Sequence, residues 1–404
     1  DLHSFPTRRS SDLVVGTDMI HNLDHSTLQQ LWWLLCSLVG ALFLFMTFVQ
    51  GGQTLLWQVA KTDREKDLVI NSLGRKWELT FTTLVLFGGA LFASFPKFYA
   101  TSFGGAYWVW MLILFTFVLQ AVSYEFRRKS LNLYGSRVYE LFLFINGSVG
   151  IFLIGAAVGT FFTGASFTLD ANNAVTWTSP LRGLEAALSL SPYSIFNICL
   201  GLFLVLNART LGAMYLINNI APDEAPELEA RLRAACGQNC RWSLPFLGIV
   251  LLFLLIMPVF VILDNASSAA TIDKVWFKYL RNLFANPWLL LLLAAGLATE
   301  AHGVWHTARH ASRKGIWFGG PGTVLIGLTV LLLPAYNNTP FYPSRVDWQS
   351  SLSIYNASSS PYTLTVMTYV ALFIPLVLAY IAYVWHLMDR SKIREEDTKG
   401  HSAY

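Results

Sequence analysis

The chain has 404 residues, of which 54% are apolar and only 13% are charged. Soluble chains average about 45 to 50% apolar and about 25% charged residues, so this composition excludes an ordinary soluble enzyme and predicts an integral membrane protein. The net charge of +4 is small and dispersed, so nucleic acid is not expected as a partner. The 14 Trp and 29 Phe suit a protein with aromatic belts at both membrane interfaces.

The N-terminal stretch is treated separately from the rest of the chain. Residues 1–13, DLHSFPTRRSSDL, have no starting Met and no apolar core, unlike a signal peptide. They resemble the translation of a sequencing-adapter oligonucleotide fused to a gene. We therefore expect residues 1–18 to be a non-native or disordered extension, and Met19 to be the natural start. Residues 19–388 are then expected to form one transmembrane domain, and residues 389–404 a cytoplasmic tail.

Nine apolar segments are long enough to cross a hydrocarbon layer about 30 Å thick as helices. An all-α polytopic membrane protein is therefore predicted. The predicted spans cover residues 30–57, 79–97, 105–123, 140–163, 193–217, 243–264, 286–305, 317–335 and 363–388. The polar loop at residues 164–192 offers a natural division between two groups of about four helices.

The distribution of Lys and Arg predicts the orientation of the chain in the membrane. These residues gather in the first, third, fifth and seventh connections and in the C-terminal tail. Cytoplasmic loops carry this excess, so the N-terminus is predicted outside and the C-terminus in the cytoplasm. Glu78, in GRKWELTF, then lies near the cytoplasmic face. As a first-turn carboxylate it would stabilise its helix by about 0.3 to 1 kcal/mol, and proton transfer is the alternative role.

Arg209 and Glu300 are the ionisable residues that stand out within the apolar spans. A charged side chain at the centre of a membrane helix costs roughly 2.5 to 3.5 kcal/mol on insertion scales. Each is therefore expected to be paired, protonated, snorkelled to the interface or functional. An Arg–Glu pair or a snorkelled guanidinium is the simpler interpretation of both residues.

Histidine and cysteine patterns give weak metal candidates. His302, His306 and His310 recur every four residues in TEAHGVWHTARH and share one helix face. This spacing can bind a metal or haem, but basic residues at the end of an interfacial helix produce it as well, and we favour the second interpretation. Cys236 and Cys240 form a CxxxC in a predicted polar loop without further ligands nearby, so no metal is assigned to this chain. Phosphate-binding, dinucleotide-binding and hydrolase motifs are absent from the sequence.

Several stretches, in order along the chain, resemble subunit II of the cytochrome bd-type quinol oxidases. They are WWLL (32–35), INSLGRKWE (70–78), GGALFASFPKFYATSFGGAYW (88–108), AVSYEFRRK (121–129), GAMYL (212–216), SLSIYNASSSPYTLTVMTYVA (351–371) and HSAY (401–404). The resemblance implies two four-helix bundles plus one extra helix, and a role in a respiratory complex that oxidises quinol and reduces oxygen to water.

The resemblance also implies where the cofactors lie. Haems b and d are expected in a partner, subunit I, which also oxidises quinol, and this chain is expected to ligate none. It would stabilise subunit I and contribute to proton uptake from the cytoplasm. Neither the quinone that is used, nor a quinone bound in this subunit, nor a small third subunit is determined by the sequence.

The family resemblance assigns the expected proton route to particular residues. Glu78 matches an acidic position at the start of the second helix, whereas Gln53 and Gln50 stand at usually acidic places in the first. Amides cannot titrate at neutral pH, so Glu78 becomes the main ionisable group. Tyr404, in the matching tail, is expected either near the entrance of the route or in a frayed end.

Two other functions are weighed against this one. The first is a secondary transporter, with Glu78, Arg209 and Glu300 as ion sites on broken helices. The second is a structural scaffold without a proton role.

Overall fold

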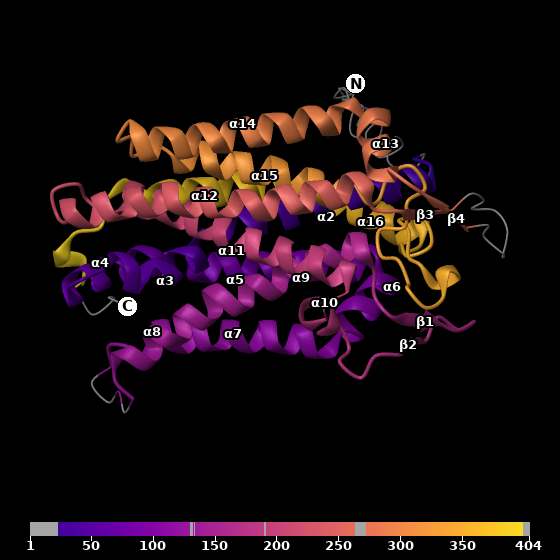
Figure 1. Ribbon diagram of the computed structural model, residues 1–404, viewed down its shortest axis with the longest axis horizontal. Coiled ribbons are helices and arrows are strands. Elements are labelled where there is room, and N and C mark those ends of the chain that lie inside the picture. The colour runs from indigo at the N-terminus through magenta and orange to yellow at the C-terminus, as the bar shows by residue number, and fades with distance from the viewer. Residues whose placement is uncertain (1–22, 130–131, 133, 190, 263–271, 399–404) are drawn as a thin grey trace, which may run out of the picture.

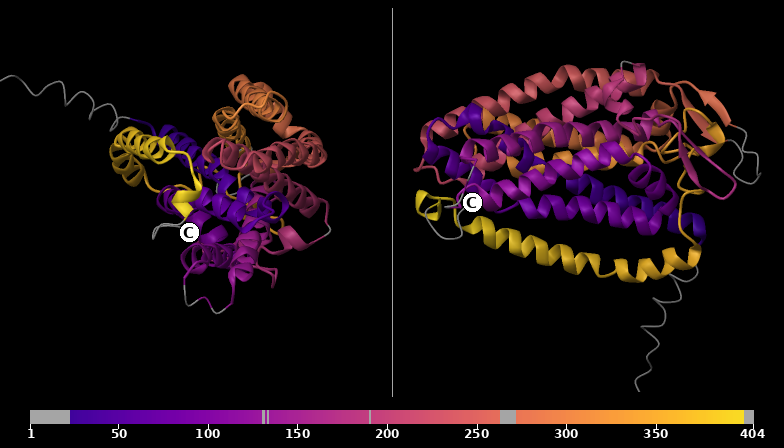
Figure 2. Two further views of the ribbon diagram at one scale, coloured as in Figure 1. Left: turned by 90° about the vertical axis from the view of Figure 1, so that its left-hand side faces the viewer. Right: turned by 90° about the horizontal axis from the view of Figure 1, so that it is seen from below.

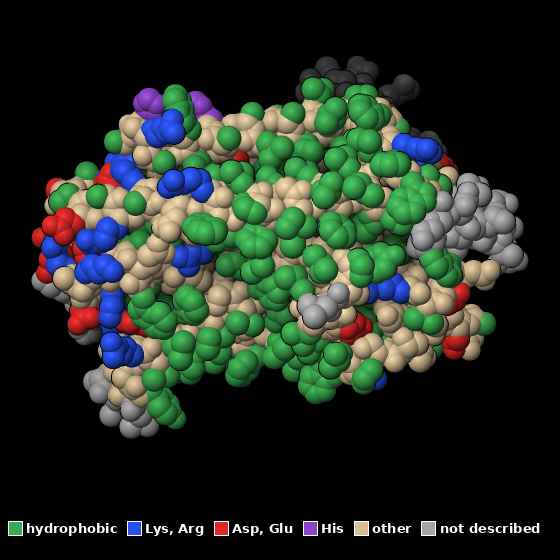
Figure 3. Space-filling model, in the orientation of Figure 1, with side chains coloured by type: hydrophobic (Ala, Val, Ile, Leu, Met, Phe, Trp, Pro, Cys, Tyr) green, Lys and Arg blue, Asp and Glu red, His purple; other side chains and the backbone are tan. Residues whose placement is uncertain are grey.

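The computed structural model describes residues 23–129, 132, 134–189, 191–262 and 272–398. The predicted extension at residues 1–18 and Tyr404 lie outside the described residues. Helices lie side by side along the long axis of the molecule (Figure 1), and apolar side chains cover much of the middle of the face shown in Figure 3. The prediction of an all-α polytopic membrane protein is confirmed.

Every predicted span overlaps a helix in the structure. The long helices are α2 (His25–Met46) followed by α3 (Phe48–Val59), α5 (Trp77–Ser94), α7 (Tyr107–Phe126), α8 (Ser136–Ile145) followed by α9 (Ile151–Thr163), α11 (Pro192–Asn219), α12 (Pro226–Ile256), α14 (Pro287–Arg309), α15 (Ile316–Leu332), and α16 (Pro361–Ala371) followed by α17 (Ile374–Arg390). Among the described residues, seven helical segments are long and apolar enough to cross a membrane; α16 and α17 make an eighth if they count as one span, bent by 42°, and α15 is shorter.

Shorter elements connect these helices. They are α4 (Asp63–Gly74), α6 (Pro96–Tyr99), α10 (Glu185–Leu188), α13 (Lys278–Ala285), the π-helices η1 (Ala100–Gly104) and η2 (Asn146–Gly150), and the 3-10 helices η3 (Trp348–Ser350) and η4 (Glu395–Thr398). Helix α4 begins with a capping box, in which the Thr62 hydroxyl accepts from the backbone N–H of Glu65 and the Glu65 carboxylate accepts from that of Thr62.

The helix that contains most of the predicted sixth span, 243–264, has different bounds from that span. Helix α12 begins at Pro226 and ends at Ile256, so Cys236 and Cys240 lie in a helix rather than in a polar loop. Pro at the first helical position and two Glu residues in the first turn favour a helix start there. Hydropathy misses this start because the first turns of α12 are polar.

Two short antiparallel hairpins were not predicted. Strand β1 (Phe167–Leu169) pairs with β2 (Val175–Trp177), with Phe167 opposite Trp177. Strand β3 (Val259–Ile262) pairs with β4 (Ile272–Val275), with Val259 opposite Val275. Both hairpins lie at one end of the helices (Figure 1), which we call the loop-rich end. The opposite end, where α3 ends and α4, α8 and α12 begin, is called the charged end.

Helix α11 lies at the centre of the packing and contacts α3, α9 and α12. Its crossing with α3 is very close, because a Cβ added to Gly51 would lie 1.8 Å from the Ala208 carbonyl oxygen, and one added to Gly212 would lie 2.3 Å from the Gly52 nitrogen. Small residues allow such approaches between membrane helices. Helix α17 has no buried residue and runs along the outside (Figure 2).

Candidate functional site

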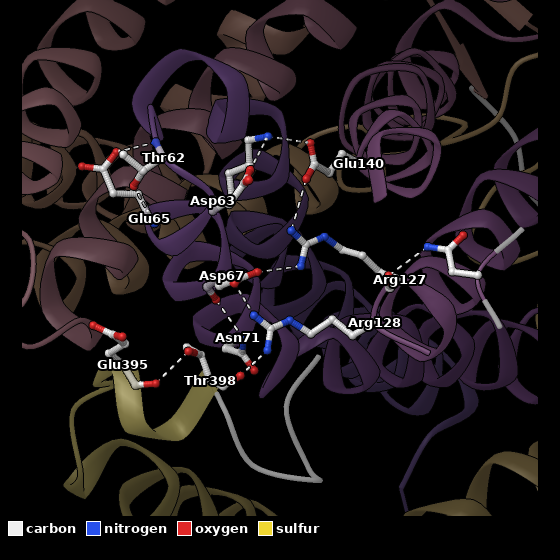
Figure 4. A network of polar contacts seen from close by, with 12 residues as sticks. Thr62, Asp63, Glu65, Asp67, Asn71, Arg127, Arg128, Glu140, Glu395 and Thr398 are labelled. Atoms are coloured by element: carbon white, nitrogen blue, oxygen red, sulfur yellow. Dashed lines mark hydrogen bonds and ion pairs between the residues drawn. The ribbon is translucent and has the colours of Figure 1, made fainter. Parts of the chain in front are cut away.

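A buried ion-pair network joins four elements at the charged end (Figure 4). The Arg127 guanidinium donates to Asp67 of α4 at 2.8 Å and to Glu140 of α8 at 3.2 Å. The Glu140 carboxylate is 1% exposed, accepts from the Trp57 indole at 3.1 Å, and lies 3.4 Å from Lys66 Nζ. Because each oxygen of Glu140 faces a donor, the network anchors α3, α4, α7 and α8 to one another.

The first residues after α17 fold back onto the same end of the molecule. Arg128 pairs with Asp67 and donates to the Thr398 carbonyl, and Arg64 lies 2.5 Å from the Glu395 carboxylate. Up to Thr398, the segment that follows α17 is therefore held against α4 and α7 by charge-assisted contacts.

A row of polar side chains, which we call the amide file, runs from this network into the helices. Its members are Gln50 and Gln53 of α3, Thr116, Gln120 and Tyr124 of α7, and Asn146 of η2, and all six are buried. The α7 members are four residues apart, so they share one helix face. Gln53 donates to the Tyr124 hydroxyl at 3.0 Å, Gln50 to Gln120 at 3.4 Å, and Asn146 to the Thr116 hydroxyl at 3.4 Å.

The amide file keeps unused hydrogen-bonding capacity. The side-chain oxygens of Gln50, Gln53 and Asn146 and the amide nitrogen of Gln120 have no partner among the described residues. A buried polar group left without a partner costs about 1 to 3 kcal/mol, and bridging water satisfies such groups in folded proteins. The file therefore has the chemistry to hold a chain of water molecules. The π-turn at Asn146–Gly150 is of a type often found at functional sites.

Glu78 does not join the amide file. It lies in the first turn of α5 and is exposed. Its carboxylate makes no hydrogen bond or ion pair with any residue that the structure describes. The neighbouring Trp77 points inward instead and stacks on Tyr124 with ring centroids 5.7 Å apart. Glu78 shares its outward face with exposed Val85, Leu86 and Phe92.

Arg209 and Glu300 are not paired with each other. Arg209 donates to the side chains of Asn239 at 2.9 Å and Gln58 at 2.5 Å, and to the Thr54 carbonyl at 3.1 Å. All its acceptors in the described part of the chain are thus neutral. An Arg209–Glu300 pair, one of the simpler interpretations from the sequence, is therefore wrong, because Arg209 faces α3 and α12 instead.

Glu300 lines a mostly apolar cavity of about 50 Å³ between α2, α9, α11, α14 and α15. Asn207 and Thr323 are its polar neighbours there. The transporter alternative requires a broken helix at the segment around Pro321. In the structure, Pro321 lies inside the continuous helix α15. Glu78, Arg209 and Glu300 therefore belong to three separate environments and do not form one ion site.

His302, His306 and His310 form a ladder on the outside of α14. Their successive ring centroids are 4.3 and 5.3 Å apart. His side chains gather at the upper left of Figure 3, where α14 ends. Within the described residues, no group of three or more His, Cys, Asp or Glu side chains is arranged to hold a metal ion.

Sequence reasoning missed several members of the site. Glu140 opens a predicted span, and Asp389 is the first residue of the predicted cytoplasmic tail. Each becomes significant only through a partner that is distant in sequence, Arg127 for the first and Lys76 for the second. The spacing of Gln120 and Tyr124 within an apolar helix was the one signal that could have been noticed, because polar residues four apart mark a polar stripe.

The helices define a polytopic membrane protein in which a file of buried polar side chains starts at the charged end. The chain belongs to a family described as cytochrome bd terminal oxidase subunit II, whose sequence profile matches residues 28–388. It is therefore a subunit of an oxidoreductase complex, and the existence of a partner subunit follows.

Individual relatives agree with this assignment. The chain is 27% identical over 400 residues to cytochrome bd-I ubiquinol oxidase subunit 2 of Escherichia coli, covering 95% of this chain and 100% of the relative. It is 26% identical over 398 residues to a probable cytochrome oxidase subunit 2 of Haemophilus influenzae, with the same coverage. The bd oxidase structure from Geobacillus thermodenitrificans superimposes with a TM-score of 0.59 at 15% identity, over 91% of this chain and 100% of that one, and so supports the fold.

Proposed function

We propose that this chain is the non-haem subunit II of a quinol:oxygen oxidoreductase, which stabilises the haem-bearing subunit I and contributes to proton uptake from the cytoplasm. In this proposal subunit I carries haems b and d and oxidises quinol. The observation that carries the proton role is the amide file, because it extends from a charged surface into the membrane region and keeps donors and acceptors free for water.

The charged end is proposed to face the cytoplasm. Its connections hold most of the Lys and Arg residues of the chain, as cytoplasmic loops do. The loop-rich end, with both hairpins, would then lie outside. Helix α2 begins at the loop-rich end, where Gln29 contacts Ser358, and α17 ends at the charged end, where Arg75 donates to the Met388 carbonyl.

Glu78 is proposed to act on the outward face of α5. A lone carboxylate at the membrane interface, beside exposed apolar residues, suits a surface that a second subunit covers. There it would take protons from cytoplasmic water and pass them toward the haem-bearing subunit. Gln50 and Gln53 would hydrogen-bond water along the internal path, but as amides they would not carry charge.

The proposal is tested with Glu78→Gln in the purified complex. We expect quinol oxidase turnover to fall several-fold while haem content stays unchanged, because glutamine keeps the size of the side chain but cannot exchange a proton. Turnover per haem and the visible spectrum are measured on the same preparation.

Two further variants make this test specific. Glu78→Asp keeps the titratable group and should recover most of the turnover, whereas Glu125→Gln removes an exposed carboxylate at the same end and should have little effect. Unchanged turnover in Glu78→Gln would leave Glu78 as a helix-start carboxylate in a structural scaffold. Loss of haem would instead show a role in assembly.

A further inference from the structure

A buried ion pair attaches the last helix to the charged end. Lys76 Nζ lies 3.2 Å from Asp389 Oδ1, and the two side chains are 0% and 8% exposed. The Trp385 indole donates to Asp389 Oδ2 at 2.7 Å, and the Lys76 ammonium lies 4.5 Å from the centre of the Trp385 ring. The contact is notable because the rest of α17 is not buried.

The Asp389 carboxylate is not saturated with donors. Its Oδ1 has the charge of Lys76 nearby but accepts no hydrogen bond of good geometry within the described residues. Glu140 differs, since each of its oxygens accepts a hydrogen bond and both lie near cations. An ionised carboxylate oxygen without a donor keeps its capacity to accept a proton, so Asp389 rather than Glu140 is the group that can take one up.

Tyr215 connects this carboxylate to the amide file. It comes from α11 and is 1% exposed, and its hydroxyl has no hydrogen-bond partner among the described residues. The Tyr215 hydroxyl is close enough to Asp389 and to Tyr124 for both to act on it electrostatically. Tyr124 in turn accepts a hydrogen bond from Gln53. A series of polar groups therefore leads from Asp389 to Tyr215, then Tyr124 and the file.

We propose that Asp389 is the proton-transfer residue that delivers protons to the amide file. It would take up the protons that Gln50 and Gln53, as amides, cannot. This inference rests on the proposed function, because it assumes that the subunit delivers protons for oxygen reduction. It differs from the role of Glu78, which lies on the outward face of α5.

Each proton transfer can be written without any electron transfer. The Asp389 carboxylate accepts a proton from hydrated cytoplasmic solvent and becomes a neutral acid, while Lys76 remains an ammonium. The acid then donates this proton, through water, to the Tyr215 oxygen as the Tyr215 hydroxyl passes its own proton to the Tyr124 oxygen. The Tyr124 hydroxyl in turn releases its proton to water along the amide file. Asp389 returns to the carboxylate, and the oxidase reaction in the partner consumes the proton.

Charged and titratable groups from several elements surround Asp389. Lys76 and Lys392 place positive charge near it, and Arg75 lies near Lys76. Tyr215 is the neutral titratable neighbour, and Trp385 holds the other oxygen. A variant that cannot ionise removes this group from proton transfer, so it should change the pH profile of turnover rather than only its scale.

The test compares Asp389→Asn with the double variant Lys76→Met/Asp389→Asn in the assembled oxidase. Asn keeps the size of the side chain and an acceptor for Trp385, and Met at position 76 removes the cation that would otherwise be buried alone. We expect both variants to keep their haem content and to lose turnover several-fold. The pH dependence of their turnover should also differ from that of the unsubstituted oxidase. Asp389→Glu should recover turnover.

The outcomes separate this inference from the proposed function. Full turnover in the double variant, with Glu78→Gln still impaired, would overturn the role of Asp389, leave the pair as a structural attachment of α17, and keep the proposed function. Full turnover in both the double variant and Glu78→Gln would overturn the proton role of the whole subunit. If Asp389→Asn loses haem, turnover per haem in the double variant decides the question.

Discussion

At the scale of single residues, the charged end depends on ion pairs of very different exposure. Glu140 and Arg127 are almost completely buried, with side-chain exposures of 1% and 5%. Glu125 and Lys129 form an exposed pair at 61% and 58%. Because removing one partner from a buried pair leaves an uncompensated charge, the two pairs should respond very differently to the same substitution.

Glu140→Gln should therefore lower the thermal stability of the complex, whereas Glu125→Gln should not. Breaking a buried pair typically costs about 3 to 5 kcal/mol, and the loss here should be somewhat smaller because Arg127 keeps Asp67 at 2.8 Å. An exposed pair contributes about 0 to 1 kcal/mol. The measurement is the unfolding midpoint of the two variants in the same detergent. Equal midpoints would contradict the role of the Arg127 network as an anchor.

The sequence could predict only those site residues whose local context is informative. Glu78 was recognisable because it follows a basic and aromatic cluster at the start of an apolar run. Glu140 and Asp389 were not, since their importance comes from Arg127 and Lys76, which are distant in sequence. The positions of Gln50 and Gln53 were identified, but their partners on α7 were not.

At the scale of elements, the close crossing of α3 and α11 positions the amide file. Gly51 lies between Gln50 and Gln53, so the contact that it makes with Ala208 determines where both amides lie along α7. Interhelical packing of this kind, rather than the hydrophobic effect, holds helices together inside a membrane.

Gly51→Ala should disrupt this crossing. Its Cβ would lie 1.8 Å from a backbone oxygen, so the helices must separate, and overpacking of this kind costs about 1 to 3 kcal/mol or more. We expect the yield of assembled, haem-containing complex to fall, as measured by size-exclusion chromatography with absorbance detection. Gly248→Ala is the matched control, because α12 leaves open space around Gly248. A normal yield for Gly51→Ala would contradict the described crossing.

The apolar spans were well predicted because hydropathy and helix length are both set by the membrane. What hydropathy could not show were the polar first turns of α12, the bend between α16 and α17, and the π-turn within the fourth span. Each of these depends on capping or on tertiary packing, which local composition does not encode.

At the scale of the whole molecule, the fold divides its tasks between its two ends. The loop-rich end carries the hairpins (Figure 1), and the charged end carries the ion-pair network (Figure 4). The charged end also holds the start of the amide file and the Lys76–Asp389 pair. Such a division suits a subunit that supports a redox partner and supplies it with protons from one side of the membrane only.

The most direct test of the central claim is purification of the native complex through a tag on this chain. We predict that haems b and d co-purify with it in a constant ratio, and that the preparation consumes oxygen when given quinol. The reduced-minus-oxidised spectrum and the oxygen uptake are recorded on the same sample. Recovery of the folded chain without haem and without quinol-dependent oxygen uptake would contradict the account.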